Sequence, residues 1–77
     1  MTDSWAGKFR HCLLRRGPAG QYAWIPAAFA EVGRPLRLKN ADGGWDDGWR
    51  VERAYGRMPG SRVRDLGLPT FFPSIDP

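Results

Sequence analysis

The residues best suited to covalent chemistry in this chain are the neighbours His11 and Cys12. A thiol activated by an adjacent imidazole is a common nucleophile in enzymes. The surrounding apolar pattern, however, predicts a strand over residues 8–16, and consecutive strand residues point to opposite faces of a sheet. The two side chains then cannot meet within one subunit. We therefore expect Cys12 to be a core or strand residue and His11 to be solvated.

Other patterns that could hold an ion or a phosphate are also incomplete. Asp42, Asp46 and Asp47 could bind a hard cation, but no carboxylate lies at EF-hand spacing from them. Loop solvation and strand pairing explain these aspartates better. Residues 17–20, Gly-Pro-Ala-Gly, lack the lysine and the following helix of a phosphate-binding loop, and they predict a turn.

Size and cysteine content argue further against an enzyme. A chain of 77 residues forms one domain with a thin core and little room for an enclosed substrate pocket. The single cysteine excludes an intramolecular disulfide, and the ligands of a structural zinc site are missing. We expect no catalytic residues, no metal, no cofactor and no small-molecule substrate. No apolar stretch is long enough to cross a membrane, and a cytoplasmic location is expected.

The charge and the aromatic content favour binding to a macromolecule. The net charge is +4, which suits nucleic acid or an acidic protein surface, although it could also serve solubility alone. A basic sheet face that carries Trp or Tyr can bind single strands by stacking and phosphate contact. Arginine and tryptophan also dominate protein–protein hot spots. The predicted contacts are four arginines at the rim and two aromatic anchors: Arg10, Arg37, Arg50, Arg53, Trp45 and Phe72.

Hydrophobic periodicity predicts a β-rich α+β fold with a four-stranded antiparallel sheet in the order β-β-α-β-β, with an SH3-like barrel as one form of it. The expected strands are residues 8–16, 21–25, 35–39 and 45–55, with a four-residue loop at 17–20. Pro26 should begin a helix of about two turns, ended by Gly33, with Phe29 and Val32 facing the sheet.

Two finer features of the strands follow from the same pattern. A two-residue turn at Asp42-Gly43 would place Lys39 opposite Asp46, and a bulge at Asp47-Gly48 would restore the register. In the second strand, Tyr22 and Trp24 share one face while Ala23 and Ile25 share the other. Because Pro26 ends that strand and starts the helix, we expect Trp24 to be a core residue.

The remaining segments flank this domain. Residues 1–7 are predicted to be a flexible lead-in, 8–57 the β-rich domain and 58–77 a tail that is partly ordered or mobile. Ser61 could cap one helical turn over residues 62–66, ended by Gly67. The apolar residues that follow either cover the core or anchor a partner: Leu68, Phe71, Phe72 and Ile75.

Over residues 12–57 the chain resembles a group of small bacteriophage proteins. The shared pattern is Cys12-Leu13-Leu14-Arg15-Arg16-Gly17, then Ala23-Trp24-Ile25-Pro26-x-x-Phe29-Ala30-x-x-Gly33-x-x-Leu36-x-Leu38, and Gly44-Trp45-Asp46-Asp47-Gly48-Trp49-x-Val51. The closing segment departs from that group, since it is rich in Pro and Phe rather than polar. The element order is also similar to that of small phage regulators that bind bacterial RNA polymerase.

The resemblance implies a phage accessory protein that acts in the host cytoplasm. Its function would be to bind a host protein complex sterically, with RNA polymerase and transcription regulation as the first candidate. A nucleic-acid-binding module that uses the same basic face is the alternative, and a minor virion component is a third.

Overall fold

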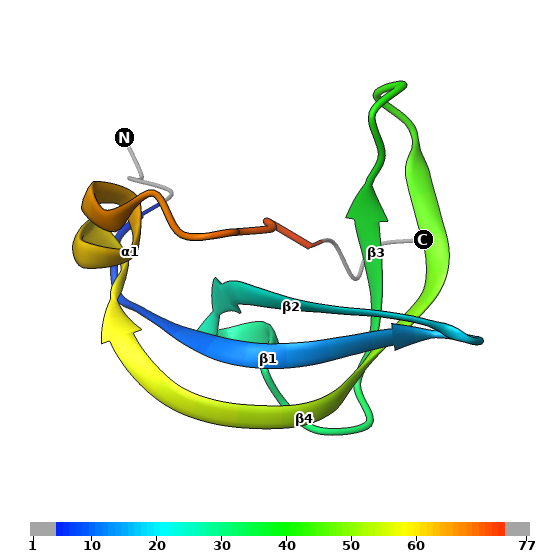
Figure 1. Ribbon diagram of the computed structural model, residues 1–77, viewed down its shortest axis with the longest axis horizontal. Coiled ribbons are helices and arrows are strands. Elements are labelled where there is room, and N and C mark those ends of the chain that lie inside the picture. The colour runs from blue at the N-terminus through cyan, green and yellow to red at the C-terminus, as the bar shows by residue number, and fades with distance from the viewer. Residues whose placement is uncertain (1–4, 74–77) are drawn as a thin grey trace.

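The computed structural model of the chain describes residues 5–73, which form a four-stranded antiparallel sheet and one α-helix (Figure 1). The strands are β1 Lys8–Arg16, β2 Ala19–Pro26, β3 Pro35–Lys39 and β4 Trp45–Pro59, and the helix is α1 Gly60–Leu66. Their order across the sheet is β2-β1-β4-β3. The predicted antiparallel, β-rich architecture is confirmed. The sheet is bent but not closed, because β2 and β3 are its two edges, so the SH3-like barrel is not confirmed.

The core lies on the inner face of the bend and follows the period-two pattern of the strands. Cys12 pairs with Ala23, and both are buried, as is Leu14 on the same face of β1. The buried cluster is completed by residues of every other strand and of the β2–β3 connection: Ile25, Ala30, Leu36, Leu38 and Val51. Because the inner positions of β2 are Ala23 and Ile25, the intervening aromatic residues must point away from the core.

Strand β4 is long and irregular, and its bulges let one strand serve two neighbours. It pairs with β1 from Lys8↔Pro59 to Arg15↔Arg50 and with β3 from Pro35↔Arg50 to Lys39↔Trp45. The β3–β4 register shifts between Leu36 and Leu38, which confirms the bulge predicted at Asp47-Gly48, where Gly48 has a φ of 91°.

The pairing of β3 near the hairpin tip differs from the prediction by one residue. Leu38, rather than Lys39, lies opposite Asp46, and Lys39 lies opposite Trp45. The cause is the turn, since Asn40 donates its backbone N–H to the carbonyl of Gly44 and leaves three residues in the loop. A two-residue turn was the wrong choice here because Gly43, with a φ of 85°, supplies the left-handed residue that a three-residue loop requires.

Two connections between strands contain a shorter loop or helix than predicted. Strands β1 and β2 are joined by Gly17 and Pro18 alone, so the four-residue loop is wrong. The predicted helix after Pro26 is a single 3₁₀ turn, η1 Ala27–Phe29. The chain cannot continue as a helix because Gly33 and Arg34 already exchange backbone hydrogen bonds with Val51 of β4. Phe29 packs against the core as predicted, but Val32 is 61% exposed.

The C-terminal part of the described chain stays packed against the rest of the domain. β4 extends to Pro59, four residues beyond the predicted end, and α1 follows directly. Gly67 ends α1 in a left-handed conformation as predicted, whereas the helix begins without the predicted Ser61 side-chain cap. Beyond α1, the chain runs back along β2, where Trp24 donates to the carbonyl of Pro69 at 2.8 Å and accepts from Phe71 at 3.1 Å. Figure 1 shows this segment crossing the inside of the bend.

A second small cluster ties the two ends of the described chain together. Trp5 stacks on Phe9 with ring centroids 5.5 Å apart, and Phe72 meets both rings edge-on. Gly60 donates its N–H to the carbonyl of Gly7 at 2.8 Å beneath these rings. The part of the predicted lead-in that the structure describes, from Trp5 onward, is therefore packed on the domain.

We predict that Gly60→Ala destabilises the protein by about 1–3 kcal/mol, because its Cβ would overlap the carbonyl oxygen of Trp5 and crowd the Phe9 ring. The measurement is the free energy of unfolding in urea, followed by tryptophan fluorescence. Gly56→Ala is the matched control, since a Cβ there meets nothing within 4 Å. Equal stabilities of the two variants would contradict this packing.

Candidate binding face

The face of the sheet opposite the core, called the outer face below, carries most of the exposed rings. Register assigns its residues, because antiparallel partners lie on the same side of a sheet. His11 lies opposite Trp24, and Leu13 lies opposite Tyr22, one position out of phase with the buried pair Cys12 and Ala23. The outer face of β1 and β2 is thus lined by large side chains that the core does not use.

Four of these rings form one contiguous group, called the aromatic platform: His11, Tyr22, Trp24 and Tyr55. His11 is at the centre, with its ring centroid 5.0 Å from that of Trp24, 5.5 Å from that of Tyr22 and 5.6 Å from that of Tyr55. The two tyrosine rings are 6.2 Å apart, and Tyr22 and Tyr55 are 56% and 41% exposed. The platform is therefore pre-ordered by its own ring contacts while still open to solvent.

The platform corrects two of our expectations. Trp24 is half-buried and stacked on His11 rather than part of the core, because Ala23 and Ile25 already occupy the inner positions of β2. His11 is likewise half-buried among rings rather than simply solvated. Cys12 is buried as expected, and burial raises the pKa of its thiol, although nearby Arg10 opposes the shift.

The two tyrosines of the platform are linked electrostatically. Burial of its phenol raises the pKa of Tyr55, and the charge of Tyr22 and a side-chain hydrogen bond with Tyr22 raise it further. Arg53 acts in the opposite direction, because a guanidinium favours the ionised phenolate. The pKa of Tyr55 thus reports on both the ring contact and the arginine beside it.

Arginines continue the outer face along β4. Arg53 lies opposite Leu13 and Arg50 opposite Arg15, so both share the face of the platform, and both are exposed. The neighbouring carboxylate of Glu52 is held by Arg15 at 3.0 Å. Within residues 5–73, neither Arg50 nor Arg53 forms an ion pair of its own. Their charges are therefore available to a ligand.

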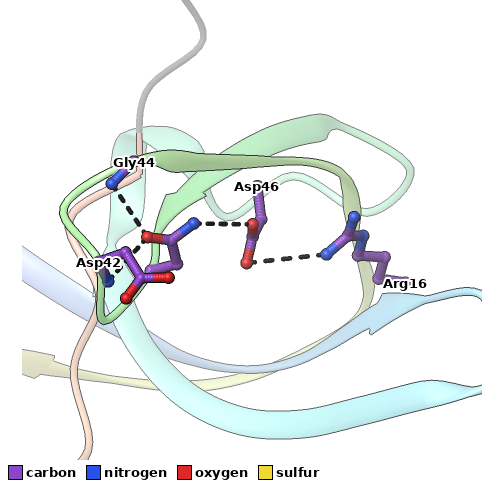
Figure 2. A network of polar contacts seen from close by, with 5 residues as sticks. Arg16, Asp42, Gly44 and Asp46 are labelled. Atoms are coloured by element: carbon purple, nitrogen blue, oxygen red, sulfur yellow. Dashed lines mark hydrogen bonds and ion pairs between the residues drawn. The ribbon is translucent and has the colours of Figure 1, made fainter.

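The β3–β4 hairpin holds Trp45 beyond these arginines. The Asn40 side chain accepts the N–H groups of Asp42 and Gly44 at 3.0 and 2.9 Å, and donates to Asp46 at 3.1 Å. Figure 2 shows this network continuing from Asp46 to Arg16 at the end of β1, 3.7 Å away. The side chain of Asn40 thus fixes the loop and joins it to the adjacent strand.

The remaining predicted contact residues are more dispersed. Trp45 is 42% exposed on the outer face, and Arg37 of the same hairpin is 2.7 Å from Asp47. Arg10 donates to the backbone carbonyl of Tyr55 at 2.7 Å. Phe72 is also 42% exposed, but it packs against Trp5 and Phe9, away from the arginines of β4.

The sequence predicted binding at the arginines, Trp45 and Phe72, and the rings of the platform were not among the predicted contacts. Tyr22 and Trp24 share a face opposite the buried Ala23 and Ile25, and this alternation was the available signal. Tyr55 had no comparable signal, because its contact with Tyr22 crosses from β4 over β1 to β2. The structure therefore adds the platform to the predicted pair Arg50 and Arg53.

Comparison with family models, with curated proteins and with solved structures finds no match for this chain. In the described part of the chain, no group of three or more His, Cys, Asp or Glu residues is arranged to hold a metal ion. None of the helices described in residues 5–73 is long and apolar enough to cross a membrane.

We predict that Asn40→Ala lowers the free energy of unfolding by about 1–3 kcal/mol, because the N–H groups of Asp42 and Gly44 and the carboxylate of Asp46 all lose a hydrogen-bond partner. Asp42→Ala is the control, since Asp42 contributes its backbone N–H and keeps it, and should change stability by about 0.5 kcal/mol or less. Urea denaturation measures both. Similar values for the two variants would mean that the Asn40 network does not hold the hairpin.

We predict that Tyr22→Phe lowers the pKa of Tyr55 toward the usual value for tyrosine, because the variant removes the charge and the hydroxyl that raise it. Arg53→Gln should raise that pKa instead. Carbon-13 NMR of ring-labelled tyrosine during a pH titration measures it, and the chain holds only these two tyrosines. An unchanged pKa in Tyr22→Phe would show that the two phenols do not interact.

Proposed function

We propose that this protein is a non-enzymatic binding protein that holds single-stranded nucleic acid on the outer face of its sheet. The observation that carries the proposal is the placement of the aromatic platform next to Arg50 and Arg53, two exposed arginines that form no ion pair within residues 5–73. Stacking rings beside a cationic path for the backbone are the two parts from which single-strand-binding surfaces are built.

The rings are arranged so that a base can reach them. Tyr22 and Tyr55 expose about half of their surface, whereas His11 and Trp24 lie more deeply and support them from below. An unpaired base has a free π-face of about the same size as these rings, so stacking on them is independent of sequence. Because the rings already contact one another, binding costs little side-chain ordering.

Electrostatics on the same face favour an anion. The nearby acid, Glu52, is neutralised by Arg15, so the positive charges of Arg50 and Arg53 remain in excess. The net charge of +4 adds long-range attraction for a polyanion. Bases on the tyrosines would leave the phosphates within reach of these guanidinium groups, which are donors well suited to phosphate oxygens.

We predict that Tyr22→Ala weakens binding to a fluorescently labelled oligothymidylate by about 1–3 kcal/mol, because a stacking ring is lost. Tyr22→Phe should bind nearly as well as the parent chain, since the ring remains. Fluorescence anisotropy at about 50 mM salt, where phosphate contacts are strong, measures the affinity. Leu66→Ala is the matched control, because Leu66 is also exposed but lies on α1.

Salt dependence tests the arginines separately from the rings. On single strands, each phosphate contact contributes about 0.7 to the slope of log affinity against log salt concentration. Arg53→Gln should therefore reduce that slope by about 0.7, and Tyr22→Ala should leave it unchanged. The proposal is wrong if the parent chain does not bind the oligonucleotide at low salt, or if Tyr22→Ala binds as tightly as Leu66→Ala.

A second candidate function is steric docking on a protein, as in a phage regulator of a host complex. It is favoured by Trp45, a ring 42% exposed on a hairpin beside the Arg37–Asp47 pair, since tryptophan and arginine are enriched in protein hot spots. RNA polymerase is the first partner to test. Co-elution with purified bacterial RNA polymerase after nuclease treatment, lost in Trp45→Ala, would support this function instead.

A further inference from the structure

The outer face does not end at the platform but continues along β4 to the hairpin. Arg50 is the residue that β4 shares between its two neighbours, lying opposite Arg15 of β1 and opposite Pro35 of β3. Beyond it, Trp45 lies opposite Lys39, one position out of phase with the buried Leu38. Trp45 therefore lies on the same face as Tyr55, at the other end of the same strand.

Between Trp45 and Tyr55, the outer face carries an excess of positive charge. The acids of β4 in this stretch are each paired with an arginine: Asp46 with Arg16 at 3.7 Å, Asp47 with Arg37 at 2.7 Å and Glu52 with Arg15 at 3.0 Å. Lys39, Arg50 and Arg53 are exposed and form no ion pair within the described residues. Between the aromatic platform and Trp45, the acids are thus neutralised by arginines. The cations Lys39, Arg50 and Arg53 remain in excess on the outer face.

Within residues 5–73, no other segment covers this stretch of the outer face. The segment that follows α1 packs on the inner side of the bend, where Phe71 contacts the core, and it reaches β2 at the edge rather than on the outer face (Figure 1). Measured along the bent strand, the ten residue steps from Trp45 to Tyr55 make a path of roughly 30 Å at about 3.3 Å per residue. That length exceeds what a single stacked base or dinucleotide covers.

We propose that one continuous single strand of nucleic acid runs along the outer face of β4 and uses two stacking sites, the aromatic platform and Trp45. Lys39, Arg50 and Arg53 contact the phosphates between them. The occupant is a polyanion with π-faces at intervals, because among the described residues from Trp45 to Tyr55 the surface alternates rings with cations that form no ion pair, and each acid of this stretch is paired with an arginine. The inference rests on the proposed function and adds to it a second stacking site and a path for the strand along β4.

The test compares two oligothymidylates, of about 4 and about 12 nucleotides, within the site sizes of small single-strand-binding domains. The short strand cannot span both sites. Its affinity should fall at least fivefold in Tyr22→Ala and be unchanged in Trp45→Ala. The long strand should lose at least fivefold in each variant, and Trp45→Tyr should restore its binding because a ring is again present. Leu66→Ala should change neither affinity.

Salt dependence adds a second readout. The slope of log affinity against log salt should fall by about 0.7 in Lys39→Gln for the long strand but not for the short one. If both strands bind and Trp45→Ala changes neither affinity, the second site is wrong and the platform alone binds. If neither strand binds, the proposed function itself fails. Loss of RNA polymerase binding in Trp45→Ala without any effect on the long strand would assign Trp45 to a protein partner.

Discussion

The structure depends on the pairing of β4 with two strands at once. Its first half is bonded to β3 and its second half to β1, and Arg50 belongs to both ladders. A straight strand could not serve both neighbours and also enclose a core. The bulges solve this, because each one bends the strand and inserts one residue, which offsets the alternation so that Val51 and Ala54 both face the core while Arg50 and Tyr55 face outward. The outer face is a consequence of that bend.

A domain of this size must also protect the edges of its sheet, and it uses the end of its own chain for one of them. Trp24 of β2 exchanges two backbone hydrogen bonds with the segment after α1, while Phe71 packs on the core and Phe72 packs on Trp5 and Phe9. Covering an edge in this way removes unpaired backbone groups that would otherwise pair with other chains. The Phe-rich segment therefore has a structural role whatever partner the protein has.

Local patterns in the sequence predicted what depends on local pairing. The alternation of Leu36 with Arg37 predicted a strand, and Asp47-Gly48 predicted a bulge. Both features depend on residues that are close together in the sequence. The helix predicted after Pro26 was too long. Helix propensity takes no account of the backbone hydrogen bonds that join Gly33 and Arg34 to Val51 of β4. The platform was missed for a related reason. His11 and Tyr55 are 44 residues apart and meet only because β1 and β4 pair with a particular register.

Trp24 connects the packed edge of the sheet with the aromatic platform. Its backbone is held by Pro69 and Phe71, and its indole stacks on His11, which in turn contacts both tyrosines. A tryptophan that served only to fill space would be expected in the core, where an inner position of β2 instead holds the small Ala23. Its stacking on His11, which contacts both exposed tyrosines, is better explained as support for a surface that must stay ordered in water. The docked chain end and the outer face are therefore two parts of one arrangement, in which packing on the edge of β2 fixes the rings that a ligand would meet.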